Sequence, residues 1–332
     1  MKTTWRAVIE SKNFKNGKFQ NMSVTPMMAK TASVGRILHD YLNRPKTVAP
    51  VAPLPSVQTD LRALASETPV IVWFGHSSYL VHAGGKNILV DPVFSGYASP
   101  VPGLVKAFPG SNVYGIKDMP HIDWIIITHN HYDHLDKQSI SRLGPHTGSF
   151  YTPIGVGKDV AAFNIPEDKI QEMDWWESAE LSPGITLTAT PARHFSGRGL
   201  KRAGSLWASF VLNVHGVKIF IGGDSGYDSH FKTIGDRYGP FDIAMLECGQ
   251  YNELWPNIHM MPEETVQAAM DLRAAVLMPV HWGKFTLANH AWNEPVERAV
   301  AAAAALGWRI TVPKIGEPVR LGEELPLAPW WK

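Results

Sequence analysis

The 332-residue sequence predicts an α/β fold built in layers, and two observations favour it. Short runs of β-branched and apolar residues recur from residue 70 onwards, and a turn ends each run. Stretches with helical spacing lie between these runs, as in proteins that pack helices against sheets. Residues 69–332 are therefore expected to form one domain. Residues 1–68 are weakly patterned and Pro-rich from 45 to 55, which predicts an N-terminal extension packed on that domain.

The expected strands follow one another in order, and a polar side chain follows each of them. The first three strands cover residues 70–74, 86–90 and 124–128, and they lead to His76, Asp91 and His129. The next three cover residues 185–190, 218–221 and 275–280, and they lead to His194, Asp224 and His281. Two helices are expected, one over residues 262–272 with Pro and Glu in its first turn, and an alanine-rich one over residues 296–306.

The densest cluster of metal-binding side chains follows the third expected strand. His129, His131, Asp133 and His134 occupy six positions that follow three consecutive isoleucines and Thr128. A stiff strand can aim several side chains at one point, and imidazole nitrogen and carboxylate oxygen are ligands that Zn²⁺ accepts readily. The alternative is a surface loop that is rich in histidine by chance. The spacing behind an apolar strand makes a metal site the better interpretation.

His194, Asp224 and His281 stand at corresponding positions of three later units. Side chains at the ends of several strands can converge on a cleft at one edge of a sheet, where rigid strand ends need little reorganisation to bind a ligand. The single cysteine, Cys248, excludes a disulfide framework within the chain and a thiolate-rich zinc cage. It follows an apolar stretch, so we expect it to be buried.

Composition limits the other functional classes. Thirty-one basic and thirty acidic side chains give a net charge of +1, so no nucleic-acid partner is expected. Residues 1–30 contain no continuous apolar core of a secretory signal, and no stretch approaches eighteen apolar residues. A cytoplasmic location is expected, with peripheral contact at the inner membrane and a homodimer both left open.

The motifs described above resemble those of the metallo-β-lactamase superfamily. Asp91, the 129–134 cluster, His194, Asp224 and His281 match its five recurring motifs in order. Between residues 70 and 295 the chain also resembles the N-acylphosphatidylethanolamine-hydrolysing phospholipase D family and its bacterial relatives. That narrower resemblance rests on WFGHS at 73–77, ILVDPVFS at 88–95, THNHYDHLD at 128–136, HFSGRG at 194–199, GDSGY at 223–227, RYGPFD at 237–242 and HWGKF at 281–285. It implies an αββα sandwich of two mixed sheets flanked by helices, with residues 69–332 as the catalytic domain.

The resemblance also implies a dinuclear zinc centre, with manganese or iron as alternatives. It assigns His129, His131 and His194 to one metal, assigns Asp133, His134 and His281 to the other, and makes Asp224 the bridge. Two metals about 3.5–4 Å apart can share a hydroxide that attacks phosphorus and can stabilise the attacking and leaving oxygens. A di-iron relative that uses oxygen would carry a carboxylate at position 131, so His131 favours hydrolysis.

Four further residues are expected to support the centre or to meet the substrate. Asp91 is expected to hydrogen-bond a ligand imidazole, with a turn-initiating role before Pro92 as the alternative. For His76, support of a ligand and a purely structural role in a turn are both open. His259 matches the family's histidine that contacts the scissile phosphate, although its spacing from Gly249 is one residue shorter. Asp133 and His259 are the expected catalytic side chains, and Trp255 and His259 are expected to contact substrate.

The function that these features favour is hydrolysis of a phosphodiester in an N-acylphosphatidylethanolamine-like phospholipid, by attack of a metal-bridging hydroxide. A lactonase or other ester hydrolase of the same fold is the alternative within enzymes. A non-catalytic metal-binding scaffold is the alternative from another class. The complete set of ligand types disfavours a scaffold, which has no chemical need for an open dinuclear centre.

Overall fold

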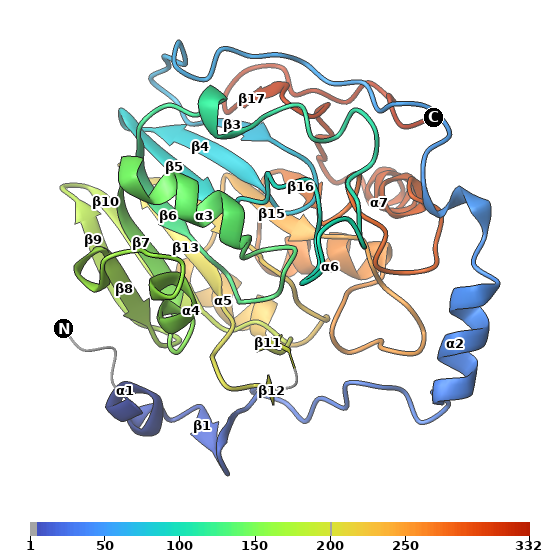
Figure 1. The fold of residues 1–332 in the computed structure, drawn as a ribbon. Coiled ribbons are helices and arrows are strands. Elements are labelled where there is room, and N and C mark those ends of the chain that lie inside the picture. Colours follow the sequence, from blue (N-terminus) through green and yellow to red (C-terminus); the bar gives the residue numbers. More distant parts are fainter. Residues whose placement is uncertain (1–4, 200) are drawn as a thin grey trace.

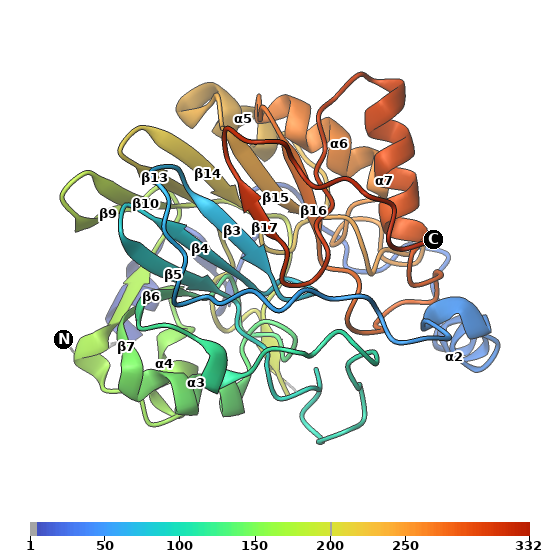
Figure 2. The same cartoon turned by 90° about the horizontal axis from the view of Figure 1, so that it is seen from above.

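Two mixed β-sheets lie face to face at the centre of the fold (Figures 1 and 2). This is a computed structural model, which describes residues 5–199 and 201–332. The seven-stranded sheet has the order β17-β3-β4-β5-β6-β7-β8, and the six-stranded sheet has the order β16-β15-β14-β13-β10-β9. Antiparallel and parallel pairs occur in both sheets, for example β3 with β4 and β5 with β6 in the first.

The strands have the following bounds. The seven-stranded sheet contains β17 (Pro318–Arg320), β3 (Val70–Trp73), β4 (Tyr79–Ala83), β5 (Lys86–Val90), β6 (Ile122–Ile126), β7 (Thr147–Pro153) and β8 (Ile170–Met173). The six-stranded sheet contains β16 (Leu277–Val280), β15 (Ile243–Glu247), β14 (Val217–Ile221), β13 (Ser209–Val214), β10 (Ile185–Thr190) and β9 (Ser178–Ser182). Two short ribbons pair β1 (Phe14–Lys15) with β2 (Lys18–Phe19) and β11 (Gly197–Arg198) with β12 (Lys201–Arg202).

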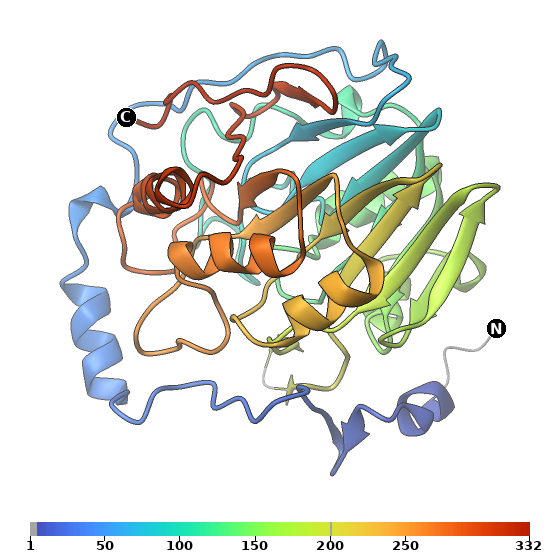
Figure 3. The same cartoon turned by 180° about the vertical axis from the view of Figure 1, so that it is seen from behind.

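Helices cover the outer faces of both sheets. On the seven-stranded sheet lie α3 (Lys137–Leu143) and α4 (Gly157–Ala161), and on the six-stranded sheet lie α5 (His230–Tyr238), α6 (Pro262–Asp271) and α7 (Glu294–Ala305). Figure 3 shows the second group from behind, in yellow to red. Single 3-10 turns occur at η1 (Lys46–Val48), η2 (Ile116–Asp118), η3 (Gly144–His146) and η4 (Glu167–Lys169). The order of layers is thus helix, sheet, sheet, helix, which confirms the predicted αββα sandwich.

Burial on both faces explains why β3 is a continuous apolar run. Ile71 and Trp73 belong to the core between the sheets, whereas Val70 and Val72 belong to the core under α3 and α4. Successive side chains of a strand point to opposite faces, so a strand covered on both sides must be apolar at every position. The side chains of β3 are accordingly at most 1% exposed.

The N-terminal extension runs along the outside of the sandwich (Figure 1). It contains α1 (Trp5–Glu10) and α2 (Val34–Leu42), and its residues 1–4 lie outside the described residues. Backbone hydrogen bonds tie it to distant loops, from Phe19 N to Ala203 O (2.9 Å), from Ala29 N to Leu254 O (2.8 Å) and from Leu54 N to Pro109 O (2.8 Å). The division at residue 68 stays a prediction. Within residues 5–199 and 201–332, no helix has both the length and the apolar character needed to span a bilayer.

The observed elements differ from the expected ones mainly at their ends. The strands expected over 86–90 and 185–190 coincide with β5 and β10, and Cys248 is buried as expected. The strand expected over 124–128 lies two residues earlier, as β6 (Ile122–Ile126), because its pairing with β5 ends where Val90 faces Ile126. The following residues leave the ladder and begin the loop that carries His129 and its neighbours.

One buried histidine outside the metal-ligand set contributes to the pH dependence of stability. His230 begins α5, and its Nε2 lies 3.1 Å from Ser225 Oγ. Burial lowers its pKa to about 3. Between about pH 3 and pH 6.5 the unfolded chain therefore binds a proton that the folded chain does not, so folding stability falls as the pH drops below 6.5.

We predict that His230→Gln reduces this loss of stability in acid. At pH 5 the histidine contributes about 2 kcal/mol of destabilisation relative to pH 7, because a displacement of one pKa unit is worth about 1.4 kcal/mol. The measurement is the free energy of unfolding in urea at pH 5 and pH 7 for the metal-free protein, with the exposed His121→Gln as the matched control. Equal pH dependence in the parent and in His230→Gln would contradict the prediction.

Candidate metal centre

The predicted ligands meet at the edge of the two sheets. The 128–136 loop follows β6, His194 follows β10, Asp224 follows β14 and His281 follows β16. Among the described residues, candidate ligand atoms form three groups, and within each group they lie within 4.8 Å of one another. The first group is His129, His131, His194 and Asp224, and the second is His76, Asp133, His134 and His281. The third group is Asp224, His281 and His259, so it overlaps the other two. The structure therefore brings all seven predicted ligands together, and their role in metal binding stays a prediction.

In the first group, three imidazoles turn their nitrogens toward one point. His194 Nδ1 donates to the carbonyl of Ile258 at 2.8 Å, so a neutral His194 has its lone pair on Nε2. That Nε2 lies 3.3 Å from His131 Nδ1, and His129 Nε2 lies 2.9 Å from the same atom. Nitrogens this close in a buried site are typical of ligands that surround a cation.

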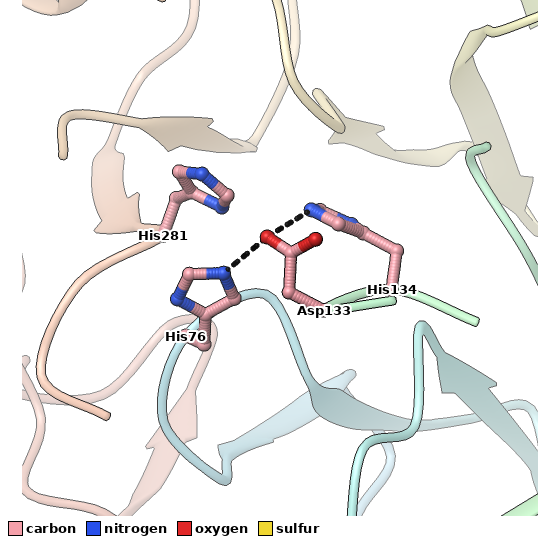
Figure 4. Close-up of side chains that lie close together, drawn as sticks. All are labelled: His76, Asp133, His134 and His281. Atoms are coloured by element: carbon pink, nitrogen blue, oxygen red, sulfur yellow. Dashed lines mark hydrogen bonds and ion pairs between the residues drawn. The ribbon is translucent and has the colours of Figure 1, made fainter. Parts of the chain in front are cut away.

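The side chains of the second group lie close together (Figure 4). His134 Nδ1 donates to Asp91 Oδ2 at 2.7 Å, which leaves its Nε2 lone pair free, 3.5 Å from Asp133 Oδ2. His281 Nδ1 lies 2.9 Å from Ser77 Oγ. The rings of His134 and His281 are stacked, with centroids 5.3 Å apart.

Asp224 lies between the two groups and faces both. Its Oδ2 is 3.2 Å from His134 Nε2 and 3.7 Å from the Nε2 atoms of His129 and His194. Its Oδ1 is 3.1 Å from His281 Nδ1. Oδ2 thus faces imidazoles of both groups, and Oδ1 faces His281 of the second group. A carboxylate in contact with both groups is suited to bridging two cations, as predicted for this residue.

Unpartnered buried atoms test whether a metal fits this site. His134 Nε2, His281 Nε2 and Asp224 Oδ1 are buried and have no hydrogen-bond partner. Leaving such atoms unsatisfied costs free energy in a folded protein, and a cation would satisfy all three. The nitrogen and oxygen donors suit Zn²⁺, and Mn²⁺ or Fe²⁺ as alternatives. The residues present therefore fit a metal centre.

The protonation states of the rings agree with this use. Burial lowers the pKa of His131 to about 4 and holds the pKa values of His129, His194 and His281 well below the usual range, so these rings are neutral at pH 7. Burial also opposes protonation of His134, but three nearby carboxylates outweigh it and hold its pKa well above the usual range. Metal binding at that ring must therefore displace a proton.

Asp91 holds His134 in place by a hydrogen bond to its ring. Its fully buried carboxylate accepts hydrogen bonds from Thr128 N (2.8 Å), Thr128 Oγ1 (2.6 Å) and His134 Nδ1 (2.7 Å). Carboxylates in this position fix the orientation and tautomer of a metal-binding imidazole. Asp91 also turns the chain, with a φ of 40°. Asp91 therefore has the geometry of both roles that the sequence left open, a hydrogen-bond partner of a predicted ligand and a residue that starts a turn.

His76 fits a supporting position better than a ligand position. Its Nε2 lies 2.9 Å from Asp133 Oδ2, so the carboxylate already occupies that nitrogen (Figure 4). The ring is fully buried, and the residue has a φ of 53°. A strained backbone at this position directs the ring at Asp133. A supporting role is one of the two roles that the sequence left open for His76.

The two predicted substrate contacts lie in different surroundings. The ring centroid of His259 is 5.1 Å from that of His194 and 5.2 Å from that of His281, so this residue reaches the site despite its altered spacing. Trp255 is half-buried, and its indole N–H donates to the carbonyl of Gln250 at 2.9 Å. Along residues 5–199 and 201–332, no hydrogen bond or ring contact joins Trp255 to the ligand cluster. Substrate contact stays a prediction for both residues.

Residues that the sequence did not single out hold the ligands in place. Asn21 of the N-terminal extension donates from Nδ2 to His194 O at 2.9 Å and accepts at Oδ1 from His194 N at 3.1 Å. Its Oδ1 also accepts from Trp207 Nε1 at 3.1 Å. Because 173 positions separate Asn21 from His194, no local pattern indicates this pairing.

Glu247 is a second such residue. It ends β15, is fully buried and lies 2.7 Å from His259 Nδ1. Burial opposes protonation of His259, but the Glu247 carboxylate outweighs it and raises the pKa of His259 to about 9. Its position at a strand end is the one sequence signal that Glu247 shares with the predicted ligands.

Comparisons with known proteins identify the family and the fold. Residues 86–282 match the family model of the β-lactamase superfamily domain. The chain is 38% identical over 335 aligned residues to an uncharacterised protein of Mycobacterium tuberculosis, covering 98% of this chain and 89% of the relative. It is 33% identical over 268 residues to the mitochondrial N-acyl-phosphatidylethanolamine-hydrolysing phospholipase D of Saccharomyces cerevisiae, covering 76% of this chain and 56% of that protein. The metallo hydrolase Igni18 of Ignicoccus hospitalis shares the fold, with a TM-score of 0.60, 22% identity, and coverage of 77% of this chain and 100% of Igni18.

We predict that Asn21→Ala weakens metal binding about tenfold, because loss of a partner behind a ligand typically costs 10–100-fold in metal affinity. The measurement is the metal content of the purified protein after equilibration with a competing chelator. Gln20→Ala is the matched control, since the exposed Gln20 amide bonds only the Lys15 and Lys18 carbonyls of its own ribbon. A metal affinity of Asn21→Ala equal to that of the control would show that the extension does not help to form the centre.

Proposed function

Because this chain belongs to the metallo-β-lactamase superfamily, whose model covers residues 86–282, we propose that it is a dinuclear metal-dependent phosphodiesterase. The substrate class that we propose is an N-acylphosphatidylethanolamine-like phospholipid. The observation that carries the proposal is the set of seven predicted ligands, six buried and His131 half-buried, that meet in two groups with Asp224 between them. Such a set is suited to hydrolysis of an anionic ester.

The residues would hold two cations, and zinc is the expected metal. His129, His131 and His194 would bind one, Asp133, His134 and His281 would bind the other, and Asp224 would contact both. Two divalent cations in this site would supply hydroxide near neutral pH and would offset the charge of a phosphate. Neutral imidazoles leave most of the cationic charge for the substrate, because they contribute no negative charge of their own.

Two observations support a lipid phosphodiester as the substrate. The yeast relative is named as a phospholipase D that hydrolyses N-acyl-phosphatidylethanolamine, and the similarity covers 76% of this chain, although only 56% of that protein. His259 also stands beside the ligand cluster, and 13% of its side chain is exposed. It can therefore contact a substrate while every predicted ligand histidine stays bound to its metal. A substrate in a bilayer implies that the protein meets a membrane surface.

The proposed reaction adds water across one phosphorus–oxygen bond. The water oxygen attacks phosphorus, the bond to the N-acylethanolamine oxygen breaks, and phosphatidate is the second product. His259 donates a proton to the leaving oxygen, and Glu247 lies behind it to balance the charge on the ring. Asp133, held by His76 at 2.9 Å, keeps its carboxylate turned toward the reacting centre.

We predict phospholipase D-type products from N-acylphosphatidylethanolamine in mixed micelles. In water enriched in ¹⁸O, one labelled oxygen should appear in phosphatidate and none in N-acylethanolamine, because attack at phosphorus breaks the bond to the alcohol. Mass spectrometry of both products makes the measurement, with phosphatidylcholine and an acyl lactone as comparison substrates. Turnover of the lactone alone would instead indicate a lactonase. Two bound metals with no turnover of any substrate would indicate a scaffold.

We predict that Asp224→Asn lowers both metal content and turnover by at least about 100-fold, since it removes the charge that both groups share. Metal analysis and the lipid assay make the measurement on the same sample. Asp228→Asn is the matched control, because it makes the same change four positions away, where the carboxylate bonds Ser229 N at 2.7 Å. Normal turnover and normal metal content in Asp224→Asn would rule out the proposed mechanism.

A further inference from the structure

The side chain behind His259 is a carboxylate that the ligand set does not use. Glu247 ends β15 and is fully buried, and its Oε2 accepts from His259 Nδ1 at 2.7 Å. Its Oε1 accepts from Ser225 N at 3.0 Å and from Met260 N at 3.2 Å. Three N–H donors therefore surround this carboxylate, and they come from the loops that carry Asp224 and His259.

These hydrogen bonds fix which edge of His259 faces outward. Two backbone N–H groups donate to Oε1, which favours the ionised form of Glu247, and an ionised carboxylate only accepts. Nδ1 therefore carries the hydrogen of the bond to Oε2, and the Nε2 edge of the ring lies opposite Glu247. Solvent does not reach the edge of the His259 ring that faces Glu247, because the Glu247 side chain has no exposed surface. The His259 side chain itself is 13% exposed. The His129, His134, His194 and His281 side chains are at most 1% exposed. Among the imidazoles of the site described here, His259 thus stands nearer to solvent than these four buried ligands.

We propose that Glu247 is a positioning residue that holds His259 with Nδ1–H inward and Nε2 toward the leaving oxygen of the substrate. This inference rests on the proposed phosphodiesterase function and names the group that prepares His259 for it. The two bonds at Oε1 anchor the carboxylate independently of His259, so the imidazole is oriented by a group that is itself fixed.

The geometry predicts what an amide at this position would do. In Glu247→Gln the side-chain oxygen must stay at Oε1 to keep the bonds from Ser225 N and Met260 N, so the new NH₂ group faces His259 Nδ1. That nitrogen then has to accept, so only the opposite edge of the ring can carry a hydrogen. The seven ligands keep their positions, but His259 loses the partner that stabilises it as a proton donor.

The test compares two phosphodiesters that differ only in the leaving group, assayed with the zinc-loaded full-length chain. An alkoxide needs a proton as it leaves, whereas 4-nitrophenolate is a stable anion and does not. For Glu247→Gln we expect kcat on the alkyl substrate to fall 10²–10⁴-fold and kcat on the nitrophenyl substrate to change by less than about tenfold. Glu247→Asp, which keeps a carboxylate, should recover part of the loss.

Glu264→Gln is the matched control, because it makes the same chemical change at a half-buried carboxylate that bonds Met261 N and not His259. Equal losses on both substrates, or no loss on either, would overturn the positioning role. Failure of the parent protein to hydrolyse either phosphodiester would instead overturn the proposed function.

A second readout does not depend on activity, and its measurement on the parent protein does not require the variant to fold. Nitrogen NMR of the zinc-loaded parent should show hydrogens on both nitrogens of His259, with the Nδ1 hydrogen bound to Glu247 and the Nε2 hydrogen available for the leaving oxygen. In Glu247→Gln only Nε2 should carry a hydrogen, while zinc content stays at two per chain. A parent protein without a hydrogen on His259 Nδ1 would overturn the inference directly.

Discussion

The candidate metal centre depends on holding many polar groups close together in a buried cluster. Asp224 contacts imidazoles of both groups within 3.7 Å, and unpartnered atoms remain on His134, on His281 and on Asp224 itself. Such a cluster is unfavourable unless a rigid surrounding prevents its atoms from moving apart or a cation joins them. The stiff strands on both sides and the residues with positive φ at His76, Asp91 and His281 provide that surrounding.

The electrostatics divide the imidazoles into two kinds. Burial keeps His129, His194 and His281 neutral, so their lone pairs need no change of protonation before a cation binds. His134 differs because Asp224, Asp133 and Asp91 surround it, and their charge outweighs its burial. The carboxylates that make the site attractive to a cation therefore also make one ring attractive to a proton. Metal and proton compete mainly at that ring, and Asp91 remains its partner in either state.

The sequence predicts features that depend on neighbouring residues, and it does not predict contacts between residues that lie far apart along the chain. The ligands were identifiable because each directly follows a short apolar strand, and strand ends such as those of β5 and β10 are local features. Asn21 and Glu247 were not, because their roles are defined by partners 173 and 12 positions away and not by the residues around them. Strand β17 was missed for the same reason, since it pairs with β3 only after the whole sandwich has formed.

Hydrogen bonds between distant residues also join the N-terminal extension to the candidate metal centre. Asn21 bonds the backbone of His194 on both sides and also accepts from Trp207, a buried residue of the core between the sheets. Asn257 in turn donates to Pro26 O at 2.9 Å, so the loop that leads to His259 rests on the extension as well. A displacement of residues 21–26 would therefore reach a predicted ligand and the predicted proton donor together. We therefore expect metal affinity and turnover to depend together on a segment that contains none of the predicted ligands.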